Sequence, residues 1–326
     1  MLRPNQRLLL LLVLLPAVLG ADSLILFIGD GMGLEHMKLG QDPSGAPWTG
    51  FPHFAEVDTR SLCGVPDSAA TATAIATGHR TDNKRIGTLE DGRAARTLAE
   101  SARGSGFRVG FVTNDRLTGA TPAAFYAHVA NRRETKAIAV FLLNSGFDIF
   151  IGGGADDFSR VAAMRAGYDY RTALDRSLGP KVLVALDEAE MPYLMDDPVG
   201  GRLLPAVQRA LERLGRDQRP FFLMIESALI DHASHENDAA RLEVEMRGNT
   251  RPVLAFLQEW IALHPGVALV ATADHECGGF NAGARSFTTD EHTDAPVAVL
   301  STRPIPDYVD EQWELNTYLL GLMREH

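Results

Sequence analysis

The sequence predicts an α/β sandwich with a largely parallel sheet. Short apolar runs alternate along the chain with longer segments of helical periodicity, as happens when helices connect parallel strands. The runs are apolar at nearly every position, which is expected for strands that are covered on both faces. The predicted strands are residues 24–28, 109–113, 147–151, 182–186, 221–225, 267–273 and 296–300.

Helical segments separate these strands. The predicted helices are residues 93–105, 134–144, 202–214, 238–263 and 310–323. The sequence contains no internal repeat, low-complexity tract or linker. We therefore predict one catalytic domain over residues 21–326, preceded by a segment of a different kind.

Residues 1–20 have the composition of a signal peptide. Arg3 and Arg7 precede an apolar run over residues 8–15, and small residues follow at positions 18, 20 and 21. The run is too short to cross a bilayer stably. We therefore expect a secreted or periplasmic protein without a membrane anchor.

The acidic composition argues against a nucleic-acid partner. The formal net charge is −11, and the 20 N-terminal residues carry two arginines and no acids, so the charge of the remainder is −13. Nucleic-acid binding requires a basic surface. The two cysteines, Cys63 and Cys277, could form a disulfide or remain free thiols, and the sequence does not distinguish these alternatives.

Acidic and histidine residues follow three of the predicted strands. Asp30 follows the first strand, and Glu226 follows the strand at 221–225. Asp274 and His275 follow the strand at 267–273. Ligands of open α/β sheets collect at the carboxyl ends of the strands. Solvated acids at strand ends are the alternative, but three strands that each deliver such a residue favour a site.

Two further segments supply histidines in metal-ligand combinations. Asp231 and His235 are four residues apart in IDHASHEND, and His292 lies in EHTD. Mixed histidine and carboxylate ligands suit zinc, and positions with oxygen ligands alone suit a harder ion such as magnesium. The sequence therefore predicts a metal centre.

The segment PDSAATATAIATG predicts a tightly packed helix that begins near Ser68 and stops at Gly78. A serine at a helix N-terminus lies where backbone N–H groups and the positive end of the dipole favour a phosphate. The alternative is that Ser68 serves only as the N-cap. A metal centre that can ionise the hydroxyl favours a nucleophile.

With these segments in view, the chain resembles the alkaline phosphatase family. The matching segments, in the order of the family, are GDGMG, PDSAATATAIATG, GATPAAFYAHVANR, IESALIDHASHENDA, TADHECGG and EHT. The resemblance implies a three-layer α/β/α sandwich around a mostly parallel central sheet. It also implies hydrolysis of phosphate monoesters through a phosphoserine on Ser68, with two Zn²⁺ and one Mg²⁺ as cofactors.

The resemblance also implies a ligand set for each metal. The first zinc would be held by Asp231, His235 and His292. The second zinc, which also contacts Ser68, would be held by Asp30, Asp274 and His275. The magnesium would be held by Asp30, Thr121 and Glu226.

The residues that bind phosphate are implied in the same way. Arg132 would be the phosphate-binding arginine, and Asp67 would orient it. His232 would contact phosphate through water, unless it is only an exposed histidine at a helix start. Gly119 departs from the family, which often has Asp or His there, and we expect water to fill the resulting gap.

Three other functions fit the sequence less well. Sulfatases need the pattern C/S-x-P-x-R, and Ser68 is followed by Ala-Ala-Thr. Related phosphodiesterases usually carry a threonine nucleophile and lack the third metal site. A non-catalytic metal- or phosphate-binding protein should have lost a ligand. We therefore expect small phosphorylated substrates, and a homodimer is possible.

Overall fold

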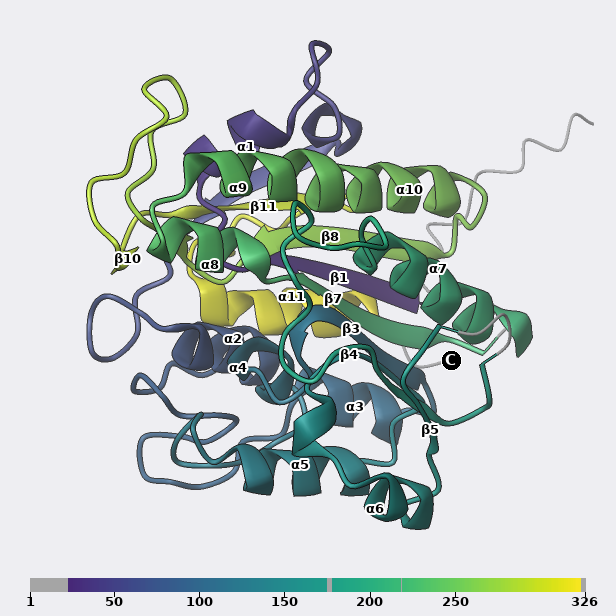
Figure 1. Ribbon diagram of the computed structural model, residues 1–326. Coiled ribbons are helices and arrows are strands. Elements are labelled where there is room, and N and C mark those ends of the chain that lie inside the picture. The colour runs from purple at the N-terminus through teal and green to yellow at the C-terminus, as the bar shows by residue number, and fades with distance from the viewer. Residues whose placement is uncertain (1–22, 175–177, 218, 324–326) are drawn as a thin grey trace, which may run out of the picture.

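The computed structural model describes residues 23–174, 178–217 and 219–323 (Figure 1). The predicted signal peptide lies outside these residues. Nine strands of the described chain form one sheet in the order β2-β11-β8-β1-β7-β3-β4-β6-β5. They are β1 Ser23–Gly29, β2 His53–Val57, β3 Arg108–Arg116, β4 Ile149–Gly153, β5 Asp169–Arg171, β6 Val182–Ala185, β7 Phe221–Ser227, β8 Val267–Ala273 and β11 Val297–Ser301.

Most neighbours in the sheet are parallel. Only β11 is antiparallel to its neighbours, β8 and β2. A separate antiparallel pair joins β9 Glu276–Cys277 to β10 His292–Thr293. The central strands β1, β7 and β8 are buried at every position, which explains their uniformly apolar sequences.

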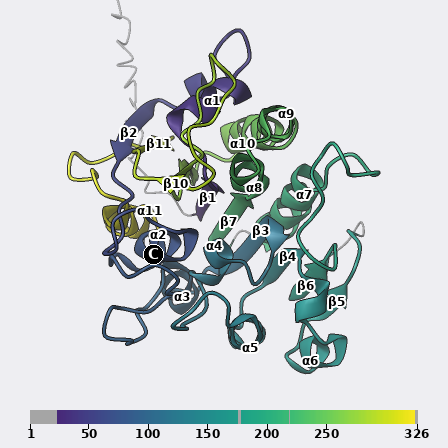
Figure 2. The ribbon, with the colours of Figure 1, turned by 60° about the vertical axis from the view of Figure 1, so that its left-hand side comes forward.

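Helices cover both faces of the sheet, so the predicted three-layer α/β/α sandwich is confirmed (Figures 1 and 2). Helices α7 and α10 pack on one face, and α3, α4 and α11 pack on the other. The helices are α1 Leu34–Gly40, α2 Ser68–Thr77, α3 Leu98–Gly104, α4 Ala120–Ala123, α5 Thr135–Asn144, α6 Arg160–Arg165, α7 Leu203–Leu214, α8 Leu229–His235, α9 Ala239–Glu245, α10 Arg251–Ala262 and α11 Leu315–Leu322.

The structure corrects several predicted boundaries. The helix predicted from residue 93 begins only at Leu98, because Thr97 and Glu100 form a capping box there. The helix predicted over residues 238–263 consists of α9 and α10 joined by a π-helical turn, Met246–Thr250. The helix predicted over residues 310–323 begins with a 3₁₀ turn, Gln312–Glu314.

The two edge strands were not predicted. Strand β2 alternates between exposed and more buried positions, so it lacks the continuous apolar run of the central strands. Strand β5 has only three residues. Edge strands are short and partly solvated, and their sequence signal is correspondingly weak.

Candidate active site

The order of the strands brings the predicted site residues to one edge of the sheet. Strand β1 lies between β8 and β7, and in the registers of these strands Gly29 is opposite both Ala273 and Ser227. The residues that follow β1 and β8, Asp30 and Asp274, are therefore neighbours. Strand β3 lies beyond β7, so four adjacent strands end at the site.

The first predicted zinc set converges on a common point. Nε2 of His235 and Nε2 of His292 are 3.0 Å apart, and they lie 3.3 and 3.5 Å from the carboxylate oxygens of Asp231. Each histidine is held through its other nitrogen, His235 by the carbonyl of Asp290 at 2.5 Å and His292 by the carbonyl of Pro66 at 2.8 Å. A carbonyl that accepts from Nδ1–H leaves Nε2 free to bind a metal.

The second predicted zinc set converges in the same way. Nε2 of His275 lies 3.5 Å from Oδ1 of Asp30 and 3.3 Å from Oδ2 of Asp274. These two carboxylate oxygens are buried and accept no hydrogen bond. Buried polar atoms normally have partners. Orphaned oxygens that face an imidazole nitrogen fit a cation, so both sets could hold the metals that the family implies.

Gly31 allows these groups to approach closely. Its φ is +69°, which favours glycine, and a Cβ there would lie 2.8 Å from Oδ1 of Asp231. Its N–H donates to Oδ1 of Asp274 at 3.1 Å. The glycine after β1 therefore lets the backbone approach the ligands of both predicted zinc ions.

The predicted magnesium ligands lie beside the second set. The Thr121 hydroxyl donates to Oδ2 of Asp30 at 3.4 Å, and Glu226 is buried beside it on β7. The sequence analysis missed Thr113, whose hydroxyl donates to Glu226. Thr113 is opposite Glu226 in the register of β3 and β7, a pairing that no local sequence pattern reveals.

Ser68 lies against the second zinc set. It is the first residue of α2, and its Oγ is 3.1 Å from Nε2 of His275. The N-cap of α2 is Asp67, whose side chain accepts from the N–H of Ala70 at 3.0 Å. Since Asp67 caps the helix, Ser68 is not the N-cap, and its hydroxyl points toward the ligands.

Arg132 lies at the mouth of the site. A pocket of about 300 Å³ is lined by Arg132, Asp67, Ser68, Asp231, His235 and His292. Nη1 of Arg132 is 3.6 Å from Oδ2 of Asp67, and its backbone N–H donates to the carbonyl of Lys84 at 2.7 Å. The structure thus brings Arg132, Asp67 and Ser68 into one pocket with one predicted zinc set.

Two further predicted positions, His232 and Gly119, both lie near Asp115. His232 is on α8 and interacts electrostatically with Asp115, which lies outside the predicted set. The gap expected at Gly119 is not open to water. A Cβ at Gly119 would lie 2.1 Å from Oδ2 of Asp115, so the carboxylate of Asp115 fills that space.

The cysteines are not bridged. Cys63 is exposed and Cys277 is buried, and both are free thiols. Sγ of Cys277 lies within 4.8 Å of the ligand atoms of the first zinc set, and it donates to the carbonyl of Asp231 at 3.9 Å. Burial raises the pKa of the Cys277 thiol, which keeps it protonated beside this set.

The buried carboxylates of the site repel one another electrostatically. Burial, followed by the charges of Asp274 and Asp231, raises the pKa of Asp30 well above its usual value. Burial also raises the pKa of Glu226, and it raises the pKa of Asp274 to about 6. The hydrogen bond to Asp231 raises the pKa of His235 to about 9. A surplus of buried negative charge is what bound cations would offset.

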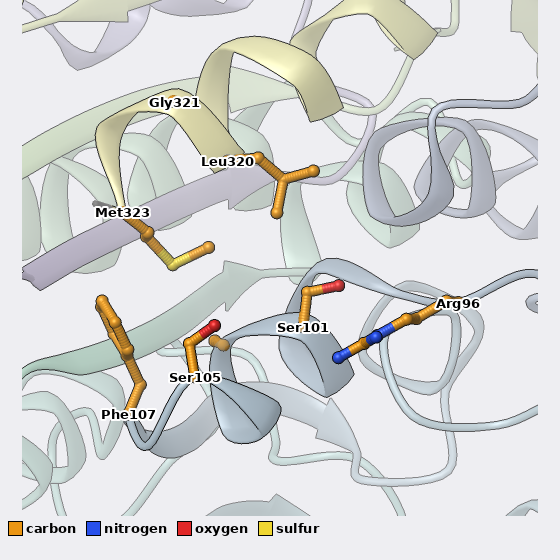
Figure 3. Close-up of a pocket in the computed structure, with 8 residues that line it drawn as sticks. Arg96, Ser101, Ser105, Phe107, Leu320, Gly321 and Met323 are labelled. Atoms are coloured by element: carbon orange, nitrogen blue, oxygen red, sulfur yellow. The ribbon is translucent and has the colours of Figure 1, made fainter. Parts of the chain in front are cut away.

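A second cavity, of about 630 Å³, lies between α3 and α11 (Figure 3). Its lining includes Arg96, Ser101, Ser105, Phe107, Leu320 and Met323. None of the described residues that line it carries a carboxylate, an imidazole or a thiol. The smaller pocket at the strand ends therefore has the ligands that this larger one lacks.

Comparison with known proteins agrees with the fold and identifies the family. The profile of the alkaline phosphatase family matches residues 21–184 and 180–303. Alkaline phosphatases 4 and 3 of Bacillus subtilis are each 29% identical, over 88% and 80% of this chain. The chain spans 67% and 62% of their lengths.

Solved structures of an alkaline phosphatase have a fold similar to that of this chain. The alkaline phosphatase from the Antarctic bacterium TAB5 superposes with a TM-score of 0.85 at 26% identity, over 94% of this chain and 99% of that one. A substituted form of that enzyme with magnesium in its M3 site gives a TM-score of 0.87.

The fold, the site and these matches make the chain a phosphatase with a metal-binding site. It belongs to the alkaline phosphatase family. In the part of the chain that the structure describes, no helix is both long and apolar enough to span a membrane.

Proposed function

We propose that this enzyme hydrolyses phosphate monoesters to an alcohol and inorganic phosphate through a phosphoserine on Ser68. The observation that carries the proposal is the position of the Ser68 hydroxyl, 3.1 Å from Nε2 of His275. Two carboxylate oxygens that accept no hydrogen bond, one of Asp30 and one of Asp274, lie close to the same nitrogen. A serine in this position faces a cation site and lies at the N-terminus of a helix.

The ligand sets described above support two zinc ions and one magnesium. Nitrogen and oxygen donors together, as in the first two sets, suit zinc. Asp30, Thr121 and Glu226 offer oxygen alone, which suits magnesium. When bound, such ions would favour the ionised forms of the serine and of the departing oxygen.

The chain itself positions the reactants. Oγ of Ser68 attacks phosphorus, the bond from phosphorus to the ester oxygen breaks, and the alcohol leaves. The guanidinium of Arg132 offers a planar fork for two phosphate oxygens and is held in place by Asp67. Water then attacks the phosphoserine and releases inorganic phosphate. The α2 dipole favours the negative charge of the phosphoryl group at each stage.

Small phosphorylated molecules fit the pocket of about 300 Å³. The composition gives no basic surface for nucleic acid. We further propose that residues 1–20 direct export to the periplasm or the medium, and that residues 21–326 form a single catalytic domain. A homodimer remains a prediction, to be tested by light scattering.

The experiment for Ser68 is to trap the phosphoenzyme. The purified protein, loaded with zinc and magnesium, is mixed with a chromogenic phosphate monoester, quenched in acid and mapped by mass spectrometry. Phosphate is expected on Ser68 and should be absent from Ser68→Ala. Ser145→Ala is the matched control, since Ser145 lies before β4, at the opposite end of the sheet from the ligands. Phosphate on another residue would contradict the proposal.

A further inference from the structure

The turn between β3 and α4 places a carboxylate where a side chain of residue 119 would lie. Oδ2 of Asp115 is 2.1 Å, and its Cγ 3.1 Å, from the position of a Cβ on Gly119. The φ of Gly119 is −56°, which any residue adopts. The glycine is therefore required for space and not for its backbone conformation. The space is taken by a residue four positions earlier in the chain.

The backbone of Asp115 is tied to the predicted magnesium site. Its N–H donates to Oγ1 of Thr113 at 2.8 Å, and that same hydroxyl donates to Glu226. Thr113 therefore connects the two acidic residues. After burial, the charge of Asp115 is the largest cause of the raised pKa of Glu226. A cation beside two buried carboxylates would offset such repulsion.

Both acidic and cationic groups of the site act on the carboxylate of Asp115. Burial raises the pKa of Asp115 and Glu190 adds to this, whereas the charges of His232 and Arg132 lower it.

We propose that Asp115 supplies the carboxylate that residue 119 lacks and supports the magnesium that Asp30, Thr121 and Glu226 would hold. This inference rests on the proposed function, because it takes the third cation site as given. It adds a residue to that site from a position that the family resemblance does not mark. It also means that Gly119 does not by itself weaken magnesium binding.

Magnesium titration separates this role from simple space filling. Zinc-loaded protein is titrated with Mg²⁺ by calorimetry, without substrate. Asp115→Asn keeps the shape and removes the charge, so we expect magnesium affinity to fall about 10–100-fold, the usual effect of losing a carboxylate that supports a metal site. Zinc content should be unchanged, and the melting temperature without magnesium should not fall, because burial disfavours the charge that the substitution removes. A magnesium affinity within about twofold of wild type would overturn the proposal.

The glycine provides a second, independent test. In the wild-type background, Gly119→Ala should displace the Asp115 carboxylate and weaken magnesium binding. In the Asp115→Ala background the same change should have no further effect, because the carboxylate is already gone. Additive losses in the double variant would contradict the proposal.

The matched control is Asp157→Asn. Asp157 contacts the same turn through Arg116 at 3.2 Å and Thr118 at 2.6 Å. Its charge is not among the causes of the raised pKa of Glu226. Magnesium affinity should remain at the wild-type value. Failure of the proposed function would appear separately, as a wild type without phosphate release or phosphoserine, since the titration does not depend on turnover.

Discussion

Asp67 links the helix of Ser68 to Arg132: it caps α2 through the N–H of Ala70, and its Oδ2 lies 3.6 Å from Nη1 of Arg132. The same carboxylate accepts the N–H of Lys84 at 3.0 Å, and the carbonyl of Lys84 accepts the N–H of Arg132. One acidic side chain therefore sets the position of Ser68 and Arg132 together.

Replacing Asp67 should separate its two roles. Asp67→Ala removes the cap, so the free energy of unfolding should fall by about 0.5–2 kcal/mol, and Arg132 loses its partner. Asp67→Asn keeps an acceptor for Ala70 and should retain most of the stability. Both variants should bind inorganic phosphate, used as a competitive inhibitor, less tightly than wild type. Denaturant unfolding and inhibition constants measure the two effects. Equal losses of stability in both variants would show that the cap is not the cause.

Arg132 should discriminate monoesters from diesters. A monoester offers non-bridging oxygens to the guanidinium fork, and a diester carries a second substituent on one of them. A charge-assisted hydrogen bond contributes roughly 1.5–3 kcal/mol, or one to two powers of ten in rate. Arg132→Ala should therefore lower kcat/KM for a monoester much more than for a diester with the same leaving group. The exposed neighbour Arg133 provides the control, Arg133→Ala. An equal decrease for both substrates would show that Arg132 does not bind the additional oxygen of the monoester. A wild type that prefers the diester would refute the monoesterase assignment.

Activity should depend on metals in a defined order. Exhaustive chelation should reduce turnover to background, zinc should restore it, and magnesium should add a further increase. Elemental analysis should give two zinc ions per chain in the wild type and fewer in His292→Ala, because His292 belongs to a set that converges on one point. His264→Ala, a change at an exposed histidine stacked on Trp260, is the control. Full activity of metal-free protein would be incompatible with this mechanism.

The metal-free protein should lose stability as the pH rises. Asp30, Glu226 and Asp274 have raised pKa values in the folded state, so folding favours their neutral forms. Their ionisation destabilises the fold from about pH 4, the unfolded pKa, upward. His235 and His292 also have raised pKa values, and their stabilising protons are lost as the pH rises through about 9 for His235.

Both groups of residues therefore act in the same direction between about pH 5 and 9. His36 and His275 have lowered pKa values and act in the opposite direction up to about pH 6.5. Calorimetry of chelated protein should therefore show a falling melting temperature from about pH 7 to 9. Zinc-loaded protein should show a much smaller decrease, because bound cations favour the ionised carboxylates and the neutral imidazoles. If the stability of the chelated protein rose with pH, the buried carboxylates could not lack partners that offset their charges.

The sequence by itself determined the central strands of the sheet and the positions of the predicted ligands along the chain. Continuous apolar runs predicted β1, β3, β7 and β8, because strands buried on both faces need them. Since the carboxyl ends of parallel strands meet at one edge, Asp30, Glu226 and Asp274 could be predicted to converge. The small residues of α2 and the glycine after it likewise predicted where the helix of Ser68 begins and ends.

Only the tertiary structure decided which side chains meet between elements. The register of β3 against β7 brings Thr113 to Glu226, and the pairing of β9 with β10 brings Cys277 beside the first zinc set. The carboxylate of Asp115 occupies the space of an absent side chain at Gly119. Such contacts depend on distances of a few ångströms between segments that are far apart in the chain. Periodicity indicates only which face of its own segment a residue occupies.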